Sequence, residues 1–159
     1  MDQILNTILI STYTQNTLKH RVLILKTYLL SQLFGNEKPQ ESLTQTDLNW
    51  LKSLPRTFYQ QFNKDNVYQI LTDLEADINK LTPLIIYLPF ENSEQIEQSI
   101  GSFVRKTFNQ NLTLDLRLNP ALIAGCTIAW KGVLRDYSLK SKIEEKKSKI
   151  FESFKKFLR

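Results

Sequence analysis

The clearest alternating pattern in the sequence occupies residues 112–118, which read Leu-Thr-Leu-Asp-Leu-Arg-Leu. Leucine recurs at every second position, and successive side chains of a strand point to opposite faces, so the pattern predicts a half-buried strand. An earlier stretch, residues 84–88 (Leu-Ile-Ile-Tyr-Leu), is apolar throughout and lies between Pro83 and Pro89. Because proline is confined to the ends of internal strands, we expect a short buried strand there.

The sequence before residue 82 shows helical spacing instead. A helix is expected over about residues 65–81, capped by Asn63 or Asp65, with a stripe formed by Val67, Ile70, Leu71, Leu74, Ile78 and Leu81. A second helix should run from about residue 16 to Phe34, where Gly35 follows as a typical terminating glycine. Shorter helices are expected over 3–13 and 46–54, with a polar loop over 36–45. Residues 1–81 are therefore predicted to form an antiparallel bundle of four or five short helices.

Helix and strand signals alternate after residue 89. Asn92 or Ser93 is placed to cap a helix that carries on one side Ile96, Ile100, Phe103 and Val104. Strands are expected over 123–130 and 133–135, joined by a Lys131-Gly132 turn, and Ser138 is placed to cap a final helix. The predicted fold class is α+β: an N-terminal antiparallel helical bundle (1–81), followed by a small mixed β-sheet domain with a long C-terminal helix (82–159).

The composition is that of a chain able to bury a core, with 42% hydrophobic and 23% charged residues. The net charge of +5 is confined to the last 21 residues, which hold eight basic and three acidic side chains, whereas the first 138 residues hold 13 of each. A generally basic, nucleic-acid-binding surface is therefore not expected. One cysteine, no signal-peptide pattern and no run of about 20 apolar residues favour a soluble chain in a reducing compartment.

Residue types that carry catalysis are scarce. The only histidine, His20, lies within a predicted helix, and the only cysteine, Cys126, lies on a predicted strand. A structural role is the simpler interpretation of each. No zinc-binding pattern and no glycine-rich phosphate loop is present, so no catalytic, metal-binding or cofactor-binding residue is predicted. The sequence favours a protein that is not itself an enzyme.

The basic C-terminal segment is amphipathic, because its lysines surround apolar side chains at near-helical spacing. A helix of this kind packs on its own domain, docks a partner helix, or lies on anionic lipid or nucleic acid. The aromatic residues continue into the last turn, which favours an external partner. The predicted partner-binding residues are Ile143, Ile150, Phe151, Phe154 and Leu158.

A second motif is more specific. Residues 118–125 read Leu-Asn-Pro-Ala-Leu-Ile-Ala-Gly, and ten residues later residues 136–139 read Asp-Tyr-Ser-Leu. This resembles the C-terminal signature of the delta subunit family of F-type ATP synthases, called the oligomycin sensitivity conferring protein in mitochondria. The positions that match are Pro120, Leu122, Ile123, Gly125, Asp136 and Ser138, and those that depart are Asn119, Ala121, Ala124 and Tyr137.

The motif residues have structural rather than catalytic chemistry. Pro120 interrupts a strand ladder, and Gly125 permits a bend or a close backbone approach. Asp136 is suited to accept hydrogen bonds from backbone amides in the turn, and Ser138 is suited to cap the helix that follows. The motif therefore predicts a specific connection between the sheet and the last helix.

The resemblance implies a non-catalytic stator subunit that links the catalytic head of the ATP synthase to its peripheral stalk in proton-driven ATP synthesis. By this resemblance, the bundle, shorter here than in the family, contacts alpha subunits, and the C-terminal domain contacts stalk b subunits. The chain would lie in the cytoplasm, peripheral on the inner face of the cell membrane, without inserting into it and without nucleic acid. The residues alone leave two alternatives: a small nucleic-acid-binding module that uses the Lys-rich helix, and a small enzyme without a known motif.

Overall fold

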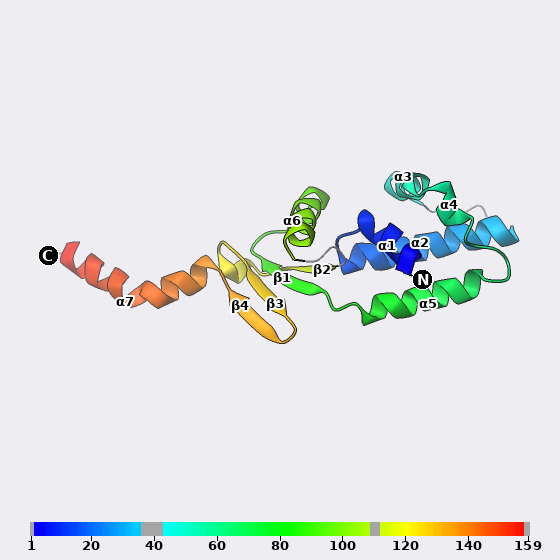
Figure 1. The fold of residues 1–159 in the computed structure, drawn as a ribbon. Coiled ribbons are helices and arrows are strands. Elements are labelled where there is room, and N and C mark those ends of the chain that lie inside the picture. The colour runs from blue at the N-terminus through cyan, green and yellow to red at the C-terminus, as the bar shows by residue number, and fades with distance from the viewer. Residues whose placement is uncertain (1, 36–42, 109–111, 158–159) are drawn as a thin grey trace.

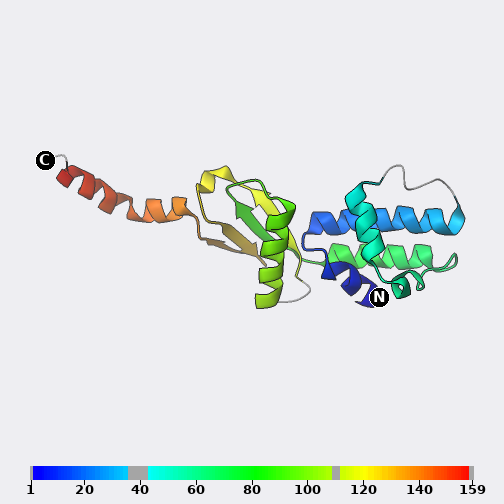
Figure 2. The same cartoon turned by 90° about the horizontal axis from the view of Figure 1, so that it is seen from above.

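The computed structural model describes residues 2–35, 43–108 and 112–157. These residues form an elongated molecule with three parts in a row: a helical bundle, a small sheet with one helix across it, and a projecting C-terminal helix (Figure 1 and Figure 2). The fold is α+β, as the sequence predicts. No helix in the described part of the chain is long and apolar enough to cross a membrane.

The bundle contains the helices α1 (Asp2–Ile10), α2 (Gln15–Phe34), α3 (Gln45–Ser53), α4 (Arg56–Tyr59) and α5 (Val67–Lys80). The two longest, α2 and α5, lie side by side (Figure 2). Gly35 ends α2 with a φ of 71°, as predicted, and Thr14, which the sequence analysis did not single out, caps its start. The single turn α4 follows Pro55 and buries Phe58; no sequence pattern predicted it.

The bundle has its own apolar core. It includes Ile8, Leu18 and Leu25 from the first two helices, and the α5 stripe supplies Val67, Leu71, Leu74 and Ile78. The other two residues of that predicted stripe, Ile70 and Leu81, are partly buried against the core. The helical spacing in the sequence therefore identified the face of α5 that packs inward.

The second half forms a four-stranded mixed sheet. Its elements are β1 (Leu84–Leu88), α6 (Glu94–Thr107), β2 (Leu114–Leu118), the 3-10 turn η2 (Pro120–Leu122), β3 (Thr127–Trp130) and β4 (Val133–Asp136). The strand order is β2-β1-β3-β4, with β1 and β2 parallel and the other pairs antiparallel. Helix α6 lies across one face of the sheet (Figure 2), where the core contains Leu84, Ile86, Leu88, Val104 and Leu114.

Three predictions of burial or extent were wrong in this half. Leu118 is 51% exposed, because it ends the edge strand β2 and has a neighbouring strand on one side only. Phe103 is 65% exposed, because Gly101 and Val104 occupy the narrow stripe of α6 that is buried. The strand predicted over 123–130 begins only at Thr127, since Ile123 follows η2 with a φ of 67° that no strand residue adopts.

Two predictions in the bundle also need adjustment. The helix predicted over 3–13 ends at Ile10, because the amide of Thr12 bonds back to the carbonyl oxygen of Leu9 and closes a tight turn. Neither Asn63 nor Asp65 is the residue directly before α5; Asn66 holds that place, and the Asn63 side chain accepts hydrogen bonds from the Asp65 and Asn66 amides. Most of the loop predicted over 36–45, residues 36–42, lies outside the described residues.

The last helix, α7 (Leu139–Phe157), projects away from the sheet (Figure 1). None of its described residues is buried. Its first turns approach the rest of the described chain at η2. The prediction of a long C-terminal helix is confirmed.

Candidate functional site: the projecting helix and its root

The start of α7 and the residues just before it, 136–139, are called its root. Backbone hydrogen bonds join this root to residues 124–126. The Leu139 amide donates to the Ala124 carbonyl oxygen at 2.8 Å, and the Tyr137 amide donates to the Cys126 carbonyl oxygen at 2.9 Å. Gly125 lies between these two bonds, with a φ of +83°. A Cβ atom there would lie less than 3.0 Å from the Tyr137 carbonyl oxygen. The start of α7 is therefore bound directly to the segment between η2 and β3.

The side chains of Asp136 and Ser138 complete this root. The Ser138 amide donates to Asp136 Oδ1 at 2.8 Å, and Ser138 Oγ accepts from the Ser141 amide at 3.2 Å in the first turn of α7. Hydrogen bonds to the Asp136 carboxylate, first from the Ser138 backbone and then from the side chains of Ser138 and Thr127, hold the pKa of Asp136 below its usual value. Ser138 is completely buried. Both side chains thus have the capping geometry that the motif predicts.

The remaining motif residues lie on the same connection. Pro120 and Leu122 belong to η2, where the Asn119 side chain accepts from the Ala121 amide and the Leu122 side chain is buried. The Asn119 amide donates to the Leu88 carbonyl oxygen at 2.7 Å, which joins η2 to the end of β1. Ile123 instead points its side chain into solvent. The structure therefore brings all six motif residues into the stretch that leads from β2 to α7.

The outer part of α7 presents an apolar surface that no described residue covers. Ile143 and Ile150 are exposed, and exposure reaches 62% at Phe154 and 90% at Phe157. A shallow apolar hollow runs along one side of the helix and is lined by Lys146, Lys149, Ile150, Ser153, Phe154 and Phe157. Phe151 is also exposed. The predicted partner residue Leu158 lies outside the described residues.

Charge surrounds this apolar surface. Residues 139–157 contain seven lysines and three glutamates, so the helix is strongly basic. A basic rim around an apolar strip matches a partner surface that is apolar at its centre and acidic at its edges. Association with such a partner would be accelerated by the charges and held by the apolar side chains.

Sequence reasoning missed further exposed apolar residues, on β4 and at the start of α7. Val133 and Leu134 are adjacent on β4 and therefore point to opposite faces of the sheet. Both are exposed, as are all residues of this edge strand. Leu139 is exposed as well and lies four residues before Ile143. That spacing in the sequence was a signal that the apolar strip begins at Leu139. No local pattern marked the two strand residues.

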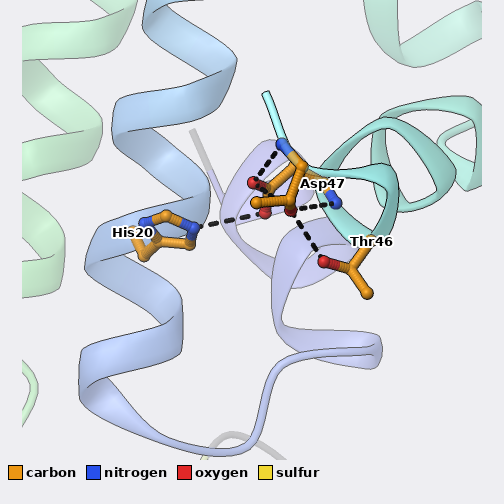
Figure 3. A network of polar contacts seen from close by, with 4 residues as sticks. His20, Thr46 and Asp47 are labelled. Carbon is orange, nitrogen blue, oxygen red and sulfur yellow. Dashed lines mark hydrogen bonds and ion pairs between the residues drawn. The ribbon is translucent and has the colours of Figure 1, made fainter. Parts of the chain in front are cut away.

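The only histidine takes part in a polar network that supports a helix start. His20 on α2 points toward Asp47 on α3, with 3.2 Å between His20 Nε2 and Asp47 Oδ1 (Figure 3). Asp47 also forms a capping box with Thr44, whose amide and hydroxyl both donate to the carboxylate. Burial works against the charged form, but these hydrogen bonds dominate and lower the pKa of Asp47. The network joins α3 to α2.

The described residues contain no group of three or more His, Cys, Asp or Glu side chains able to hold a metal ion. Cys126 is half-buried, and burial raises the pKa of its thiol, which disfavours the reactive thiolate. The candidate site is therefore argued from the exposed apolar surface of α7 and from the hydrogen bonds at its start.

The architecture defines the class of protein as α+β, with a helical bundle, a small mixed sheet and a helix that no other described element covers. The model of the ATP synthase delta (OSCP) subunit family matches residues 61–150, more than half of the chain, and the chain belongs to that family. The family is a non-catalytic subunit of the ATP synthase. The match runs from before α5 into α7 and confirms the resemblance seen in the motif. A search of curated proteins found no match.

Proposed function

We propose that this chain is the stator subunit that connects the catalytic head of the ATP synthase to its peripheral stalk. Rotation of a central shaft exerts torque on the head, so a stator needs two separated docking surfaces and a stiff body between them. The described molecule is elongated, with the bundle at one end and α7 at the other (Figure 1). Family membership and this shape both support the proposal.

The observation that carries the proposal is the exposure of the apolar side chains of α7. Most of the stability of a helix in a protein comes from packing its apolar face against another element. The apolar side chains of α7 remain exposed in the isolated chain. Full burial of one large apolar side chain contributes roughly 1.5–3 kcal/mol, so docking several of them supplies substantial affinity. The proposed partner is the helical peripheral stalk formed by b subunits.

The proposed contact with the alpha subunits uses the bundle. Exposed apolar side chains there include Leu23 and Phe34 on α2 and Tyr68 on α5. The rings of Phe34 and Tyr68 lie 5.7 Å apart, so α2 and α5 share an exposed aromatic pair. Such a pair is suited to receive an apolar segment of another subunit. In this proposal the protein is peripheral on the inner face of the membrane, as part of the complex.

We also propose that residues 1–81 and 82–159 are separate domains. The supporting observation is the division of the buried apolar residues into two clusters, one ending at Ile78 and the other beginning at Leu84. Circular dichroism of a fragment with residues 1–81 should then show helix and little strand. A disordered or strand-rich spectrum would move the boundary.

The test of the function compares two double variants in binding to a peripheral-stalk b-subunit segment. Ile150→Ala with Phe154→Ala removes apolar side chains from the hollow, whereas Lys155→Ala with Lys156→Ala removes charges outside it. Docking on a stalk helix predicts loss of binding for the first pair. The second pair should weaken binding modestly, and less so at high salt.

A nucleic-acid-binding function predicts the opposite order. Each lost phosphate contact would flatten the salt dependence of binding by about one unit of slope, so the lysine pair would matter more. Binding to the stalk segment that survives loss of Ile150 and Phe154 would end the stator proposal for α7. Circular dichroism of both variants confirms that the body remains folded.

A further inference from the structure

The segment between α1 and α2, residues 11–14, lies between the bundle and the sheet. The bundle holds it through Arg21, whose Nη1 donates to the Ser11 carbonyl oxygen at 2.7 Å and to the Thr12 hydroxyl at 2.7 Å. Trp50 Nε1 donates to the Ser11 hydroxyl at 3.2 Å, and the Arg21 guanidinium lies over the Trp50 ring. Thr12 and Thr14 are buried. Hydrogen bonds and burial therefore hold this segment against the bundle.

The sheet domain grips the same segment through Arg105 on α6. Its guanidinium donates to the carbonyl oxygens of Leu9 and Thr12 in the bundle, and its Nε donates to the Leu112 carbonyl oxygen at 3.1 Å. Leu9 lies in the last turn of α1, where the helix dipole favours a positive charge. Burial lowers the pKa of Arg105, yet arginine remains charged at any ordinary pH.

The Tyr13 side chain packs against α6 at two residues of that helix, Arg105 and Gly101. The Arg105 guanidinium carbon lies 4.7 Å from the centre of the Tyr13 ring. On the same helix, Gly101 is buried, and a Cβ atom there would lie less than 3.0 Å from the Cβ and ring atoms of Tyr13. Since the Tyr13 Cβ is tied to the backbone, it has little room to move away. Only glycine at position 101 allows the two domains to approach this closely.

The backbone completes the contact at the edge of the sheet. The Leu114 amide of β2 donates to the Tyr13 carbonyl oxygen at 2.9 Å, and Thr14 pairs with Leu114 in a parallel bridge. Residues 13–14 of the bundle thus extend the sheet at the outer side of β2. The covalent connection between the domains lies elsewhere, at residues 81–83 between α5 and β1.

We infer that Arg105, Gly101 and Tyr13 form a non-covalent junction that holds the bundle and the sheet domain in one fixed orientation. A three-residue linker alone would let the two parts swivel, whereas a second attachment at a different place removes that freedom. Arg105 is the positioning residue, because its guanidinium group donates to backbone carbonyl oxygens of the bundle and of the sheet domain. The inference does not depend on the proposed function. In a stator, this junction would transmit force between the two docking ends.

The first test is hydrogen exchange in the full chain. The Leu114 amide bonds across the junction, whereas the Leu84 amide bonds to the Thr113 carbonyl oxygen within the sheet domain. Gly101→Ala should abolish the protection of the Leu114 amide and leave that of Leu84 intact. The matched control is Ser102→Ala, an exposed change on the same helix. Because alanine favours a helix over glycine by about 1 kcal/mol, instability of α6 cannot explain such a result.

The second test measures the distance between the domains. Spin labels at Gln32→Cys on α2 and Lys131→Cys in the β3–β4 turn, in a Cys126→Ser background, should give a narrow distance distribution in the otherwise native chain. Arg105→Gln and Gly101→Ala should broaden it while circular dichroism stays unchanged. A broad distribution in the chain with native Arg105 and Gly101, or equal protection of Leu114 in Gly101→Ala and Ser102→Ala, would overturn the inference. The distance distribution of the chain with the native junction tests the inference even if a variant fails to fold.

Discussion

Gly125 lies against the backbone of Tyr137, so closely that a single added Cβ atom would approach the Tyr137 carbonyl oxygen within 3.0 Å. Its φ of +83° is also one that side chains rarely adopt. The two features coincide where the segment after η2 meets the start of α7. The direction in which α7 leaves the sheet therefore depends on a residue without a side chain.

Gly125→Ala should lower the free energy of unfolding by roughly 1–3 kcal/mol, through backbone strain together with overpacking. Gly132 is a matched control, because its φ of +81° is nearly the same while no heavy atom lies within 4 Å of an added Cβ. Gly132→Ala should therefore carry the strain alone and cost less. Equal denaturation midpoints for the two variants would show that the approach to Tyr137 contributes nothing.

Acid should weaken the root of α7. The pKa of Asp136 is held low in the folded protein by hydrogen bonds, first from the Ser138 amide. A carboxyl group of this kind stabilises the fold above its ordinary pKa of 3.8, and the contribution is lost as the pH falls through the lower folded value. Asp136→Asn should therefore flatten the acid limb of the curve of stability against pH.

Ser138→Ala separates the contribution of the Ser138 helix cap from that of the Asp136 carboxylate. It removes the acceptor for the Ser141 amide and should cost about 1 kcal/mol across the pH range. It leaves the Ser138 amide on Asp136, so much of the acid dependence should persist. Urea denaturation of the three proteins at several pH values checks both effects, and an acid limb unchanged in Asp136→Asn would contradict the assignment.

Thr113 contains a buried hydroxyl for which the described residues provide no hydrogen-bond partner. An unsatisfied buried polar group costs roughly 1–3 kcal/mol, so Thr113→Val should leave stability unchanged or raise it. Thr12→Val is the matched contrast, since the Thr12 hydroxyl donates to the Ile8 carbonyl oxygen and accepts from Arg21. That change should destabilise the protein. Thermal denaturation of both variants measures these changes in stability. A clear loss of stability in Thr113→Val would show that the Thr113 hydroxyl has a hydrogen-bond partner.

Alkaline pH should weaken the bundle through Tyr59. Burial, aided by the nearby Tyr28, raises the pKa of Tyr59 to about 12, and its hydroxyl donates to the Leu51 carbonyl oxygen at 2.6 Å. Folding favours the neutral phenol, so its contribution is complete below the ordinary pKa of 10.0 and is lost as the pH rises toward about 12.

The free energy of unfolding of the native protein should therefore fall between pH 10.0 and about 12 more steeply than that of Tyr59→Phe. At neutral pH the variant should be less stable by about 1 kcal/mol, the usual worth of one hydrogen bond. Parallel alkaline limbs for the native protein and Tyr59→Phe would show that Tyr59 does not control this loss of stability.

Local patterns in the sequence were enough to predict most of the elements. The i, i+3 and i, i+4 spacing that marked α5 and the alternation that marked β2 reflect which neighbouring side chains share a face of a helix or strand. Gly35, Gly125 and Ser138 were identified for the same reason, because caps and tight approaches impose requirements on single residues. The family was recognised from such a cluster of local requirements.

The tertiary structure alone decided which distant residues meet. Tyr13 and Gly101 have no periodic relation, and their contact arises only because α6 crosses the sheet beside the turn after α1. The exposure of Leu118 likewise depends on β2 being an edge strand, which follows from the strand order and not from its alternating leucines. Periodicity reports the face that a side chain occupies, whereas the neighbour opposite that face is set by how the elements assemble. For the same reason the apolar strip of α7 was predictable, but its lack of any covering element among the described residues became visible only in the fold.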